Sequence, residues 1–326
     1  MRKIVITGFI VALCLLIIPL IGIKGEKKAV KTSAVSEKAE KEAPEAETYT
    51  ENAYPDTVFR IKTDGGINEI TATEYVTGVV AAEMPADFSV EALKAQCVAA
   101  YTFALYRKGE GRYDGYDLTD SYKTDQSYID EEKRKEKWGE AYEEKQAKIN
   151  AAVAAVNGEY LLFDGKPALT LYHALSGGVT NSCEDVFGAK IPYLVSVDSE
   201  GDRLSPDYKS VFSFSEDDLM TRLLPVSAAT GGKNLFSEVK TAKSGLVLSL
   251  DYAGTKSTGG KIAELLGLPS AAFTVEQVDS GYMITCVGRG HGVGMSQYSA
   301  ELMAKQGADY KEILYHFYPG TKLSDE

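Results

Sequence analysis

The feature that most constrains the fold is a helix–proline–helix stretch over residues 73–105. Thr73 is a residue type that caps helices, and the run after it stays compatible with a helix through Ala82. Pro85 ends this helix, because the residue before a proline is disfavoured in the helical conformation. A second helix is expected over residues 90–106, and its many alanines let neighbouring backbone approach closely. The sequence therefore predicts two consecutive helices, of which the second is central.

Glu83 occupies an unusual position in the last turn of the first helix, next to apolar residues such as Val79 and Val80. Apolar surroundings withhold water from the carboxylate, and the carboxyl end of a helix carries partial negative charge, so both effects raise the pKa. A general acid near neutral pH needs a glutamate pKa raised from ~4.3 to roughly 6–7. The alternative is a structural Glu83 that points to solvent or pairs with Lys94. The stretch by itself leaves both roles open.

The charge balance restricts the class of ligand. The formal net charge is −12 at pH 7, whereas a general nucleic-acid binder needs a basic patch. We therefore expect no nucleic-acid partner, and any anionic ligand must be met by local cations. The length of 326 residues allows one large domain or two small ones.

The first 56 residues are predicted to lie outside the folded body. After a short tail (1–3), residues 4–23 form a run of twenty residues without a charge, long enough to span a bilayer. No small-residue cleavage site follows, so we predict a retained single-pass anchor rather than a signal peptide. Lysines flank both sides, so charge counting does not fix the orientation. Residues 24–56 are rich in Lys, Glu, Ala and Thr and are predicted to be a disordered tether.

The body, residues 57–326, is predicted to have an α+β fold. A strand pair opens it, a long charged helix is expected over 131–156, and Asp164-Gly165 marks a hairpin turn. Strand 191–199, helix 213–224, helix 261–266, helix 296–305 and a last helix capped by Asp309 follow. We expect the helical pair that carries Glu83 to pack with mixed strands around a cleft, and residues of about 200–287 to form a strand-rich lobe.

Glycines at positions 288, 290, 292 and 294 form a second notable pattern. In an extended chain all four would line one face, with Arg289, His291 and Val293 on the other. A face without side chains lets a ligand or another strand approach closely. The spacing differs from a dinucleotide-binding fingerprint, and no βαβ unit frames it.

Other candidate site residues also have structural alternatives. The loop 109–128 is rich in Gly, Tyr and Asp, which suits a sugar-binding cleft and equally an ordinary polar loop. His173 precedes a Ser-Gly-Gly loop, although a lone histidine is more often structural. Outside the apolar N-terminal run three cysteines remain, too few for a complete disulfide framework.

Several separated motifs resemble one family, that of stage II sporulation protein D of endospore-forming bacteria. They are AAEMP and EALKAQCVAA within 74–105, DQSY at 125–128, YHALSGGVTNSCEDVFG, LLGLPSAAF at 265–273 and GHGVGMSQYSAELMAKQG. The likeness spans residues 57–323. It implies a membrane-anchored lytic transglycosylase that cleaves peptidoglycan glycan strands during forespore engulfment, with its body outside the cytoplasm, between the mother-cell and forespore membranes.

The resemblance also implies the site and the partners. Glu83, in AAEMP, would be the catalytic acid and then the base. The glycan would first be stripped of stem peptides by an amidase, stage II sporulation protein P, and a membrane protein, stage II sporulation protein M, would recruit both. Some family members hold zinc; here we expect no cofactor, and the alternative is a zinc site drawn from Cys97, Cys183, Cys286, His173 or His291.

A lytic transglycosylase needs one carboxylic acid, because the sugar's own 6-hydroxyl attacks the anomeric carbon, whereas a hydrolase usually needs two. Peptide-free muramic acid carries a lactyl carboxylate, for which Lys94 and Arg289 are the candidate cations. The full set of predicted substrate-binding residues is Lys94, Gln96, Gln126, Tyr128, His173, Ser176, Gly177, Arg289, His291 and Gln297.

The chain departs from the family pattern at three points. Tyr101 stands where an arginine is usual, Ser299 where glycine is common, and the tryptophan usual in the glycine run is missing from GRGHG. Two alternatives to the transglycosylase stay open. One is a non-catalytic glycan-binding scaffold or amidase enhancer; the other is a two-carboxylate hydrolase that uses a residue such as Asp87.

Overall fold

The computed structural model describes residue 54 and residues 57–156, 158–227 and 235–324. The predicted tail, anchor and tether fall outside these residues, apart from Tyr54, which is buried. Within the described ranges, no helix has both the length and the apolar character needed to cross a membrane.

The predicted helix–proline–helix stretch forms two helices, α1 (Ala72–Glu83) and α2 (Val90–Glu110). The N-cap of α1 is Thr71 rather than Thr73: the Thr71 hydroxyl accepts the Glu74 N–H at 3.2 Å, while Thr73 lies inside the helix. The helix ends at Glu83, directly before Met84 and Pro85, as predicted. Helix α2 runs four residues beyond the predicted end at 106, up to the left-handed Gly111 (φ +59°).

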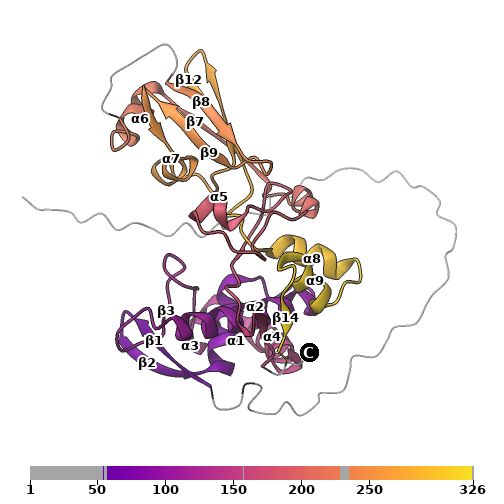
Figure 1. Cartoon of the computed structure of the whole chain (residues 1–326). Helices are drawn as coiled ribbons and strands as arrows, with labels where there is room; N and C mark the ends of the chain where they lie inside the picture. The colour runs from indigo at the N-terminus through magenta and orange to yellow at the C-terminus, as the bar shows by residue number, and fades with distance from the viewer. Residues whose placement is uncertain (1–53, 55–56, 157, 228–234, 325–326) are drawn as a thin grey trace, which may run out of the picture. The chain divides into compact units, whose positions relative to one another are not determined.

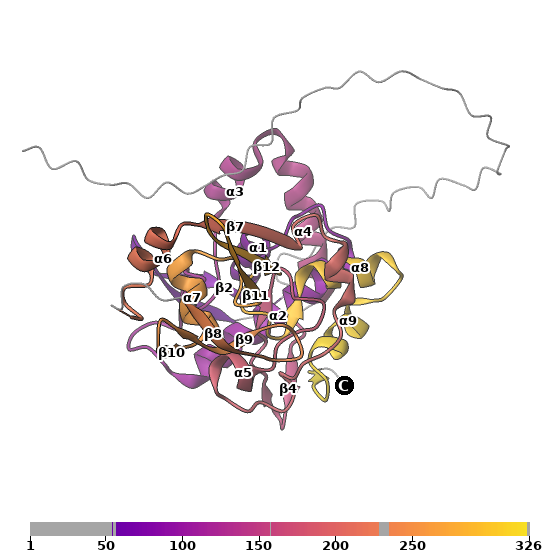
Figure 2. The same cartoon turned by 90° about the horizontal axis from the view of Figure 1, so that it is seen from above.

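Helix α2 lies at the centre of the first hydrophobic core, as its alanines predict. It contacts α1, α4 (Tyr142–Val156), α8 (Gln297–Lys305) and α9 (Tyr310–Phe317). Both views show α8 and α9 side by side (Figures 1 and 2). Small side chains along α2 make this close packing possible, and these are fully buried: Ala92, Ala95, Ala99, Ala100 and Ala104.

The long charged helix predicted over 131–156 is two helices instead. Helix α3 (Glu131–Trp138) is followed by a short 3-10 turn, η1 (Gly139–Ala141), and then by α4. The break occurs at Gly139, whose φ of +52° cannot continue a right-handed helix. Its N–H donates to the Lys135 carbonyl and closes α3.

Small sheets border the first core. Strands β1 (Val58–Thr63) and β2 (Gly66–Thr71) pair antiparallel, and β3 (Leu118–Thr119) joins β1 in parallel. Phe59 and Ile61 alternate inward along β1 and are fully buried. Strands β4 (Leu161–Phe163) and β5 (Lys166–Pro167) flank the predicted hairpin turn, and β14 (Lys322–Leu323) adds to β4.

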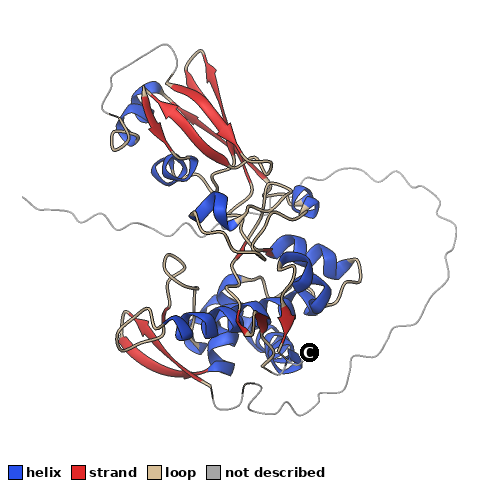
Figure 3. Cartoon of the chain, viewed as in Figure 1, coloured by secondary structure: helices blue, strands red, loops and turns tan. Residues whose placement is uncertain are grey.

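A second hydrophobic core belongs to the strand-rich region, where the strands gather in Figure 3. Two three-stranded antiparallel sheets have the orders β10-β9-β8 and β11-β12-β7. Tyr282, Ile284 and Cys286 alternate inward along β12. The elements are β7 (Lys209–Phe214), α6 (Glu216–Arg222), β8 (Phe236–Thr241), β9 (Val247–Tyr252), β10 (Thr255–Ser257), α7 (Gly259–Leu266), β11 (Phe273–Val278) and β12 (Gly281–Val287).

The strand predicted over 191–199 is absent there; this segment makes only an isolated bridge, between Val179 and Asp198. A turn forms at its start, because the Leu194 N–H donates to the Ile191 carbonyl. Further on, the Thr180 hydroxyl accepts the Val197 N–H at 2.9 Å, and a side chain thus takes the place of a strand partner.

The glycine run of residues 288–294 is not extended as predicted, because all four glycines have φ between +73° and +95°. The expected close approach does occur. Strand β13 (Met295–Ser296) pairs in parallel with β6 (Tyr172–His173), and a Cβ at Gly294 would collide with the Leu171 carbonyl oxygen. The run therefore lies tightly against residues 171–181, whose backbone and side-chain atoms occupy the space that side chains on the run would need.

Candidate functional site

A pocket of about 270 Å³ lies at the end of α1 and brings together distant parts of the chain. Its walls come from α1, α2, the loop before α3, strand β6 with its flanks, the glycine run and the start of α8. The lining residues are Glu83, Phe103, Tyr122, Asp125, Gln126, Thr170, Leu171, Tyr172, His173, Ala174, Arg289, Gly290, His291 and Gln297.

Glu83 is the last residue of α1 and reaches this pocket half-buried. Its Oε1 accepts the backbone N–H of Ser127 at 2.7 Å. Burial raises the pKa of the Glu83 carboxyl above its usual value, while the hydrogen bonds from Ser127 and the charge of Lys137 act to lower it. The net direction is upward, so Glu83 holds its proton to a higher pH than an exposed glutamate does.

Lys137, from α3, covers the end of the acid-bearing helix. Its Nζ donates to the carbonyl of Ala81 at 2.8 Å and to that of Ala82 at 3.4 Å. These carbonyls are among those that a helix end leaves without partners. The cation thus offsets the negative helix end expected to act on Glu83, which leaves burial as the main cause of the raised pKa.

A buried amide connects Glu83's surroundings to strand β6. The Gln126 amide nitrogen donates to the Tyr75 hydroxyl at 3.0 Å and to the Ala100 carbonyl at 3.2 Å. The Tyr172 hydroxyl donates to the Gln126 oxygen at 2.7 Å. Burial and, after it, the charge of Glu83 raise the pKa of Tyr172. Tyr172 therefore stays protonated and faces the pocket as a neutral hydroxyl.

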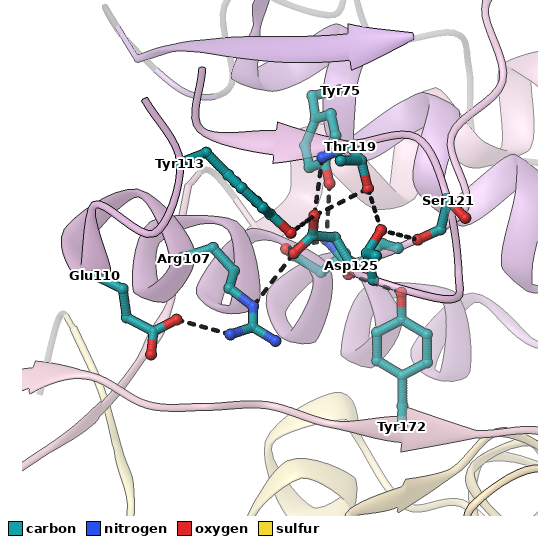
Figure 4. A network of polar contacts seen from close by, with 11 residues as sticks. Tyr75, Arg107, Glu110, Tyr113, Thr119, Ser121, Asp125 and Tyr172 are labelled. Atoms are coloured by element: carbon teal, nitrogen blue, oxygen red, sulfur yellow. Dashed lines mark hydrogen bonds and ion pairs between the residues drawn. The ribbon is translucent and has the colours of Figure 1, made fainter. Parts of the chain in front are cut away.

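Asp125 is the second carboxylate that lines the pocket, and Figure 4 shows it at the centre of a hydrogen-bond network. Its Oδ2 accepts from the Tyr113 hydroxyl (3.1 Å), the Thr119 N–H (2.9 Å) and the Thr119 hydroxyl (3.0 Å). Its Oδ1 lies 3.4 Å from Nε of Arg107. With its side chain fully buried, Asp125 anchors the loop that presents Gln126 and the Ser127 N–H to the site.

Both pocket histidines are neutral near pH 7. Nδ1 of His173 lies 3.2 Å from the Val293 carbonyl, and burial lowers the pKa of His173 to about 4. His291 accepts the Val293 N–H on Nδ1 at 3.0 Å, and burial followed by the proximity of His173 lowers its pKa to about 3. Because Nδ1 of His173 must donate to a carbonyl, Nε2 is left as an acceptor, and it has no partner among the described residues.

Arg289 supplies the positive charge at the pocket. Its side chain is exposed, and no described carboxylate lies within ion-pair distance of it. Its backbone is fixed by two hydrogen bonds with Leu175, at 2.8 and 3.1 Å. An anionic group in this pocket would therefore meet a cation that is not already neutralised.

Of the predicted substrate-binding residues, Gln126, His173, Arg289, His291 and Gln297 line the pocket with Glu83. Lys94 and Gln96 do not. Lys94 forms an ion pair with Glu91 at 2.7 Å and not with Glu83. Gln96 is buried behind the pocket wall, where its oxygen accepts from Gln297 at 3.2 Å.

The other predicted residues outside the pocket have structural contacts. Tyr128 stacks on Tyr75 with ring centroids 5.7 Å apart. The Ser176 N–H donates to Oδ2 of the buried Asp202 at 2.6 Å, and the carbonyl of Gly177 accepts from Tyr208 at 3.1 Å. The Ser-Gly-Gly loop is thus tied into the core.

The three described cysteines belong to different elements and do not form a common metal site. Cys97 is in the core along α2, Cys183 begins α5 (Cys183–Phe187), and Cys286 faces the second core from β12; all three are buried and free. The described residues contain no group of three or more His, Cys, Asp or Glu side chains placed to hold a metal ion.

Two departures from the family pattern have clear structural settings. Tyr101 is buried away from the pocket, where its ring packs edge-on against Tyr54 at 4.5 Å and its hydroxyl lies 3.2 Å from that of Thr57. Ser299 uses the side chain that glycine lacks, because its hydroxyl donates to Oδ1 of Asp202 at 2.9 Å.

Sequence reasoning missed Asp125, Ser127, Lys137 and Tyr172. Three of these adjoin residues it did select, since Asp125 and Ser127 flank Gln126 and Tyr172 precedes His173. That adjacency is a signal that could have found them. Lys137 gave no local signal, because only the tertiary packing of α3 on α1 brings it to the helix end.

The geometry defines a mixed α+β protein whose pocket contains one carboxylic acid of raised pKa, neutral hydrogen-bonding groups and a cation. A family model and the similar proteins all indicate the same family. Residues 62–163 match the family model described as stage II sporulation protein. Stage II sporulation protein D of Bacillus subtilis (strain 168) is 36% identical over 313 residues, which cover 93% of this chain and 86% of that protein.

A second relative, stage II sporulation protein D of Bacillus amyloliquefaciens, is 36% identical over 263 residues, 79% of this chain and 76% of that protein. The amidase enhancer of Bacillus subtilis (strain 168) is 28% identical over 302 residues, 76% of this chain and 40% of that protein. The chain belongs to the stage II sporulation protein D family.

Proposed function

We propose that this protein is a lytic transglycosylase of sporulation that cleaves peptidoglycan glycan strands and leaves 1,6-anhydro-muramic acid ends. The observation that carries the proposal is Glu83, a half-buried acid with a raised pKa at a pocket rich in hydrogen-bonding groups. Glu83 protonates the glycosidic oxygen as the bond to the anomeric carbon breaks. The resulting carboxylate then takes the proton from the sugar's 6-hydroxyl as that oxygen bonds to the anomeric carbon.

The positions of the other carboxylates favour this chemistry over hydrolysis by two acids. Asp87 is 77% exposed and paired with Lys145 at 3.2 Å, and it does not line the pocket. Asp125 does line it, but its Oδ2 already accepts three hydrogen bonds and its Oδ1 faces Arg107. Neither is placed as a free nucleophile or base opposite Glu83, as a two-carboxylate hydrolase would need.

The charge at the pocket supports a glycan without stem peptides as the substrate. Each peptide-free muramic acid carries a lactyl carboxylate, and the unpaired Arg289 matches it. We include in the proposal an amidase partner of the stage II sporulation protein P type, which would remove the peptides, and a recruiting membrane protein of the M type. A body outside the cytoplasm, held by the predicted anchor, would place the pocket next to this substrate.

The test is incubation of peptide-free glycan strands with the full chain and with Glu83→Gln. We expect the wild type to release fragments one water lighter than hydrolysis products, and Glu83→Gln to lower the rate at least ~100-fold. Asp87→Asn is the matched control and should keep the wild-type rate. Reducing-end products that depend on Asp87 would instead establish the hydrolase.

A second candidate function follows from the similarity to the amidase enhancer. In that case the protein would bind glycan and stimulate an amidase without cutting the strand. Two substrates separate the functions: peptide-free glycan for binding and cleavage, and glycan that still carries its stem peptides for amidase stimulation. The enhancer would be established by equal binding of peptide-free glycan by wild type and Glu83→Gln, no anhydro product from either, and faster peptide release from the peptide-bearing glycan by added amidase.

A further inference from the structure

Two exposed aromatic side chains lie beside the Glu83 pocket. Of the large apolar side chains exposed within the described ranges, the aromatic ones are Tyr122, 71% exposed, and Phe187, 55% exposed. Tyr122 lines the pocket itself. Phe187 packs edge-on against His291, another lining residue, with ring centroids 5.5 Å apart. Single exposed apolar side chains are common, but exposed aromatic rings that gather at one pocket indicate a binding surface.

Local hydrogen bonds fix the backbone that carries each ring. Tyr122 lies in a turn in which the Thr124 and Asp125 N–H groups donate to the Ser121 carbonyl, at 3.1 and 2.8 Å. Figure 4 shows the neighbouring Ser121 and Thr119 within this network. Phe187 ends helix α5, where the Gly188 N–H closes the helix on the Glu184 carbonyl at 3.0 Å. A backbone that is already ordered does not have to be ordered again when a ligand stacks on the ring, which lowers the entropic cost of binding.

A second pocket, of about 280 Å³, shares His291 with the first. Helix α5 contributes Asp185 and Val186 to it, directly before Phe187, and most other lining side chains are aliphatic. Thr258 and Ser270 also line it, so apolar surface and hydrogen-bonding groups occur together. The two pockets therefore meet at His291, next to the Phe187 ring.

We propose that Tyr122 and Phe187 are stacking platforms for two different sugar rings of one glycan strand, and that the strand extends from the Glu83 pocket past His291 into the second pocket. The C–H face of a pyranose is apolar and packs on an aromatic ring, while its hydroxyl edges need polar partners such as the exposed side chain of Arg289. The proposal rests on the proposed function, because it takes the ligand at Glu83 to be a glycan.

The experiment measures binding in the full chain carrying Glu83→Gln, so that turnover does not interfere. The probes are peptide-free glycan oligosaccharides of two and of six sugars, titrated by calorimetry. Tyr122→Ala and Phe187→Ala should each weaken hexasaccharide binding about tenfold. Tyr122→Phe and Phe187→Tyr keep the ring and should bind as the parent does. The parent should bind the hexasaccharide more tightly than the disaccharide, and Phe187→Ala should lose part of that gain.

Ile67→Ala is the matched control, because Ile67 is 52% exposed on β2 and lines neither pocket. Unchanged hexasaccharide affinity in both alanine variants would overturn the proposal, as would a Tyr122→Phe variant as weak as Tyr122→Ala. If the alanine variants bind the hexasaccharide more weakly but the wild type forms no anhydro product, the transglycosylase proposal is wrong and the stacking platforms are retained. If the wild type forms anhydro product but Tyr122→Ala and Phe187→Ala bind normally, the stacking platforms are wrong and the transglycosylase proposal is retained.

Discussion

Replacing Asp125 by asparagine tests how the pocket holds its acid. The Asp125 side chain is fully buried, accepts three hydrogen bonds on Oδ2 and faces Nε of Arg107 with Oδ1. Asparagine keeps an acceptor oxygen at only one of the two carboxylate positions. At the other position its N–H₂ group faces N–H or O–H donors and can accept no hydrogen bond from them. Hydrogen bonds to a charged group contribute about 1.5–3 kcal/mol each. Arg107 is partly solvated and keeps Glu110 at 2.7 Å, so we expect Asp125→Asn to lower the free energy of unfolding by about 3 kcal/mol.

The loss of stability is measured by urea denaturation of the full chain. Tyr113→Phe is the matched control, since it removes one of the donors to Oδ2, at 3.1 Å, and leaves the carboxylate in place. It should cost about 1.5 kcal/mol, the lower end of the range for a hydrogen bond to a charged group. An Asp125→Asn variant as stable as the wild type would contradict the reasoning, because it would mean that the buried network contributes nothing.

A second measurement separates positioning from simple stability. The loop that Asp125 anchors carries Ser127, whose hydrogen bonds lower the pKa of Glu83. If the loop loosens, that lowering is lost and the pKa of Glu83 rises further. Glu83 must be protonated to donate, so activity falls as the pH rises through its pKa. The alkaline limb of the pH–rate profile should therefore move to higher pH in Asp125→Asn, and an unmoved limb in a destabilised variant would refute the positioning role.

Two further predictions concern the histidines and the glycine run. Burial lowers the pKa of His173 to about 4, whereas the unfolded value is ~6.5. Below pH ~6.5 the unfolded chain therefore binds a proton that the folded chain does not, and the free energy of unfolding falls as the pH falls toward 4, by about 2 kcal/mol at pH 5. The free energy of unfolding of His173→Gln, from urea titrations at pH 7 and 5, should fall less over this interval than that of the wild type; an equal fall would contradict the assignment. Gly294→Ala should lower the free energy of unfolding by at least about 3 kcal/mol, because it forces a Cβ onto the Leu171 carbonyl at a positive φ. Gly307→Ala is the control, because Gly307 also has a positive φ but has open space around it, and this substitution should cost about 1–2 kcal/mol. Equal shifts in melting temperature for the two variants would show that the contact with Leu171 does not matter.

Local sequence signals determined much of the secondary structure. Pro85 sets the end of α1 because its ring restricts the preceding residue, and the alanines of α2 predict a central helix. Asp309 caps α9 with a complete capping box. One error occurred where a side-chain contact overrode the local pattern, because the Thr180 hydroxyl takes the place of a strand partner for Val197. Another had a local cause, because Gly139 breaks the helix predicted over 131–156.

The sequence alone placed Glu83 at the apolar end of a helix and, through separated motifs, associated it with His173, Arg289, His291 and Gln297. Only the tertiary structure decided that these residues share one pocket, because residues 171–174 and the glycine run meet α1 through long-range packing. The same packing removed Lys94 from the pocket and brought Lys137 to the end of α1. A residue's type and spacing determine its local conformation, whereas its charge partners and its access to water depend on contacts with residues far away in the chain.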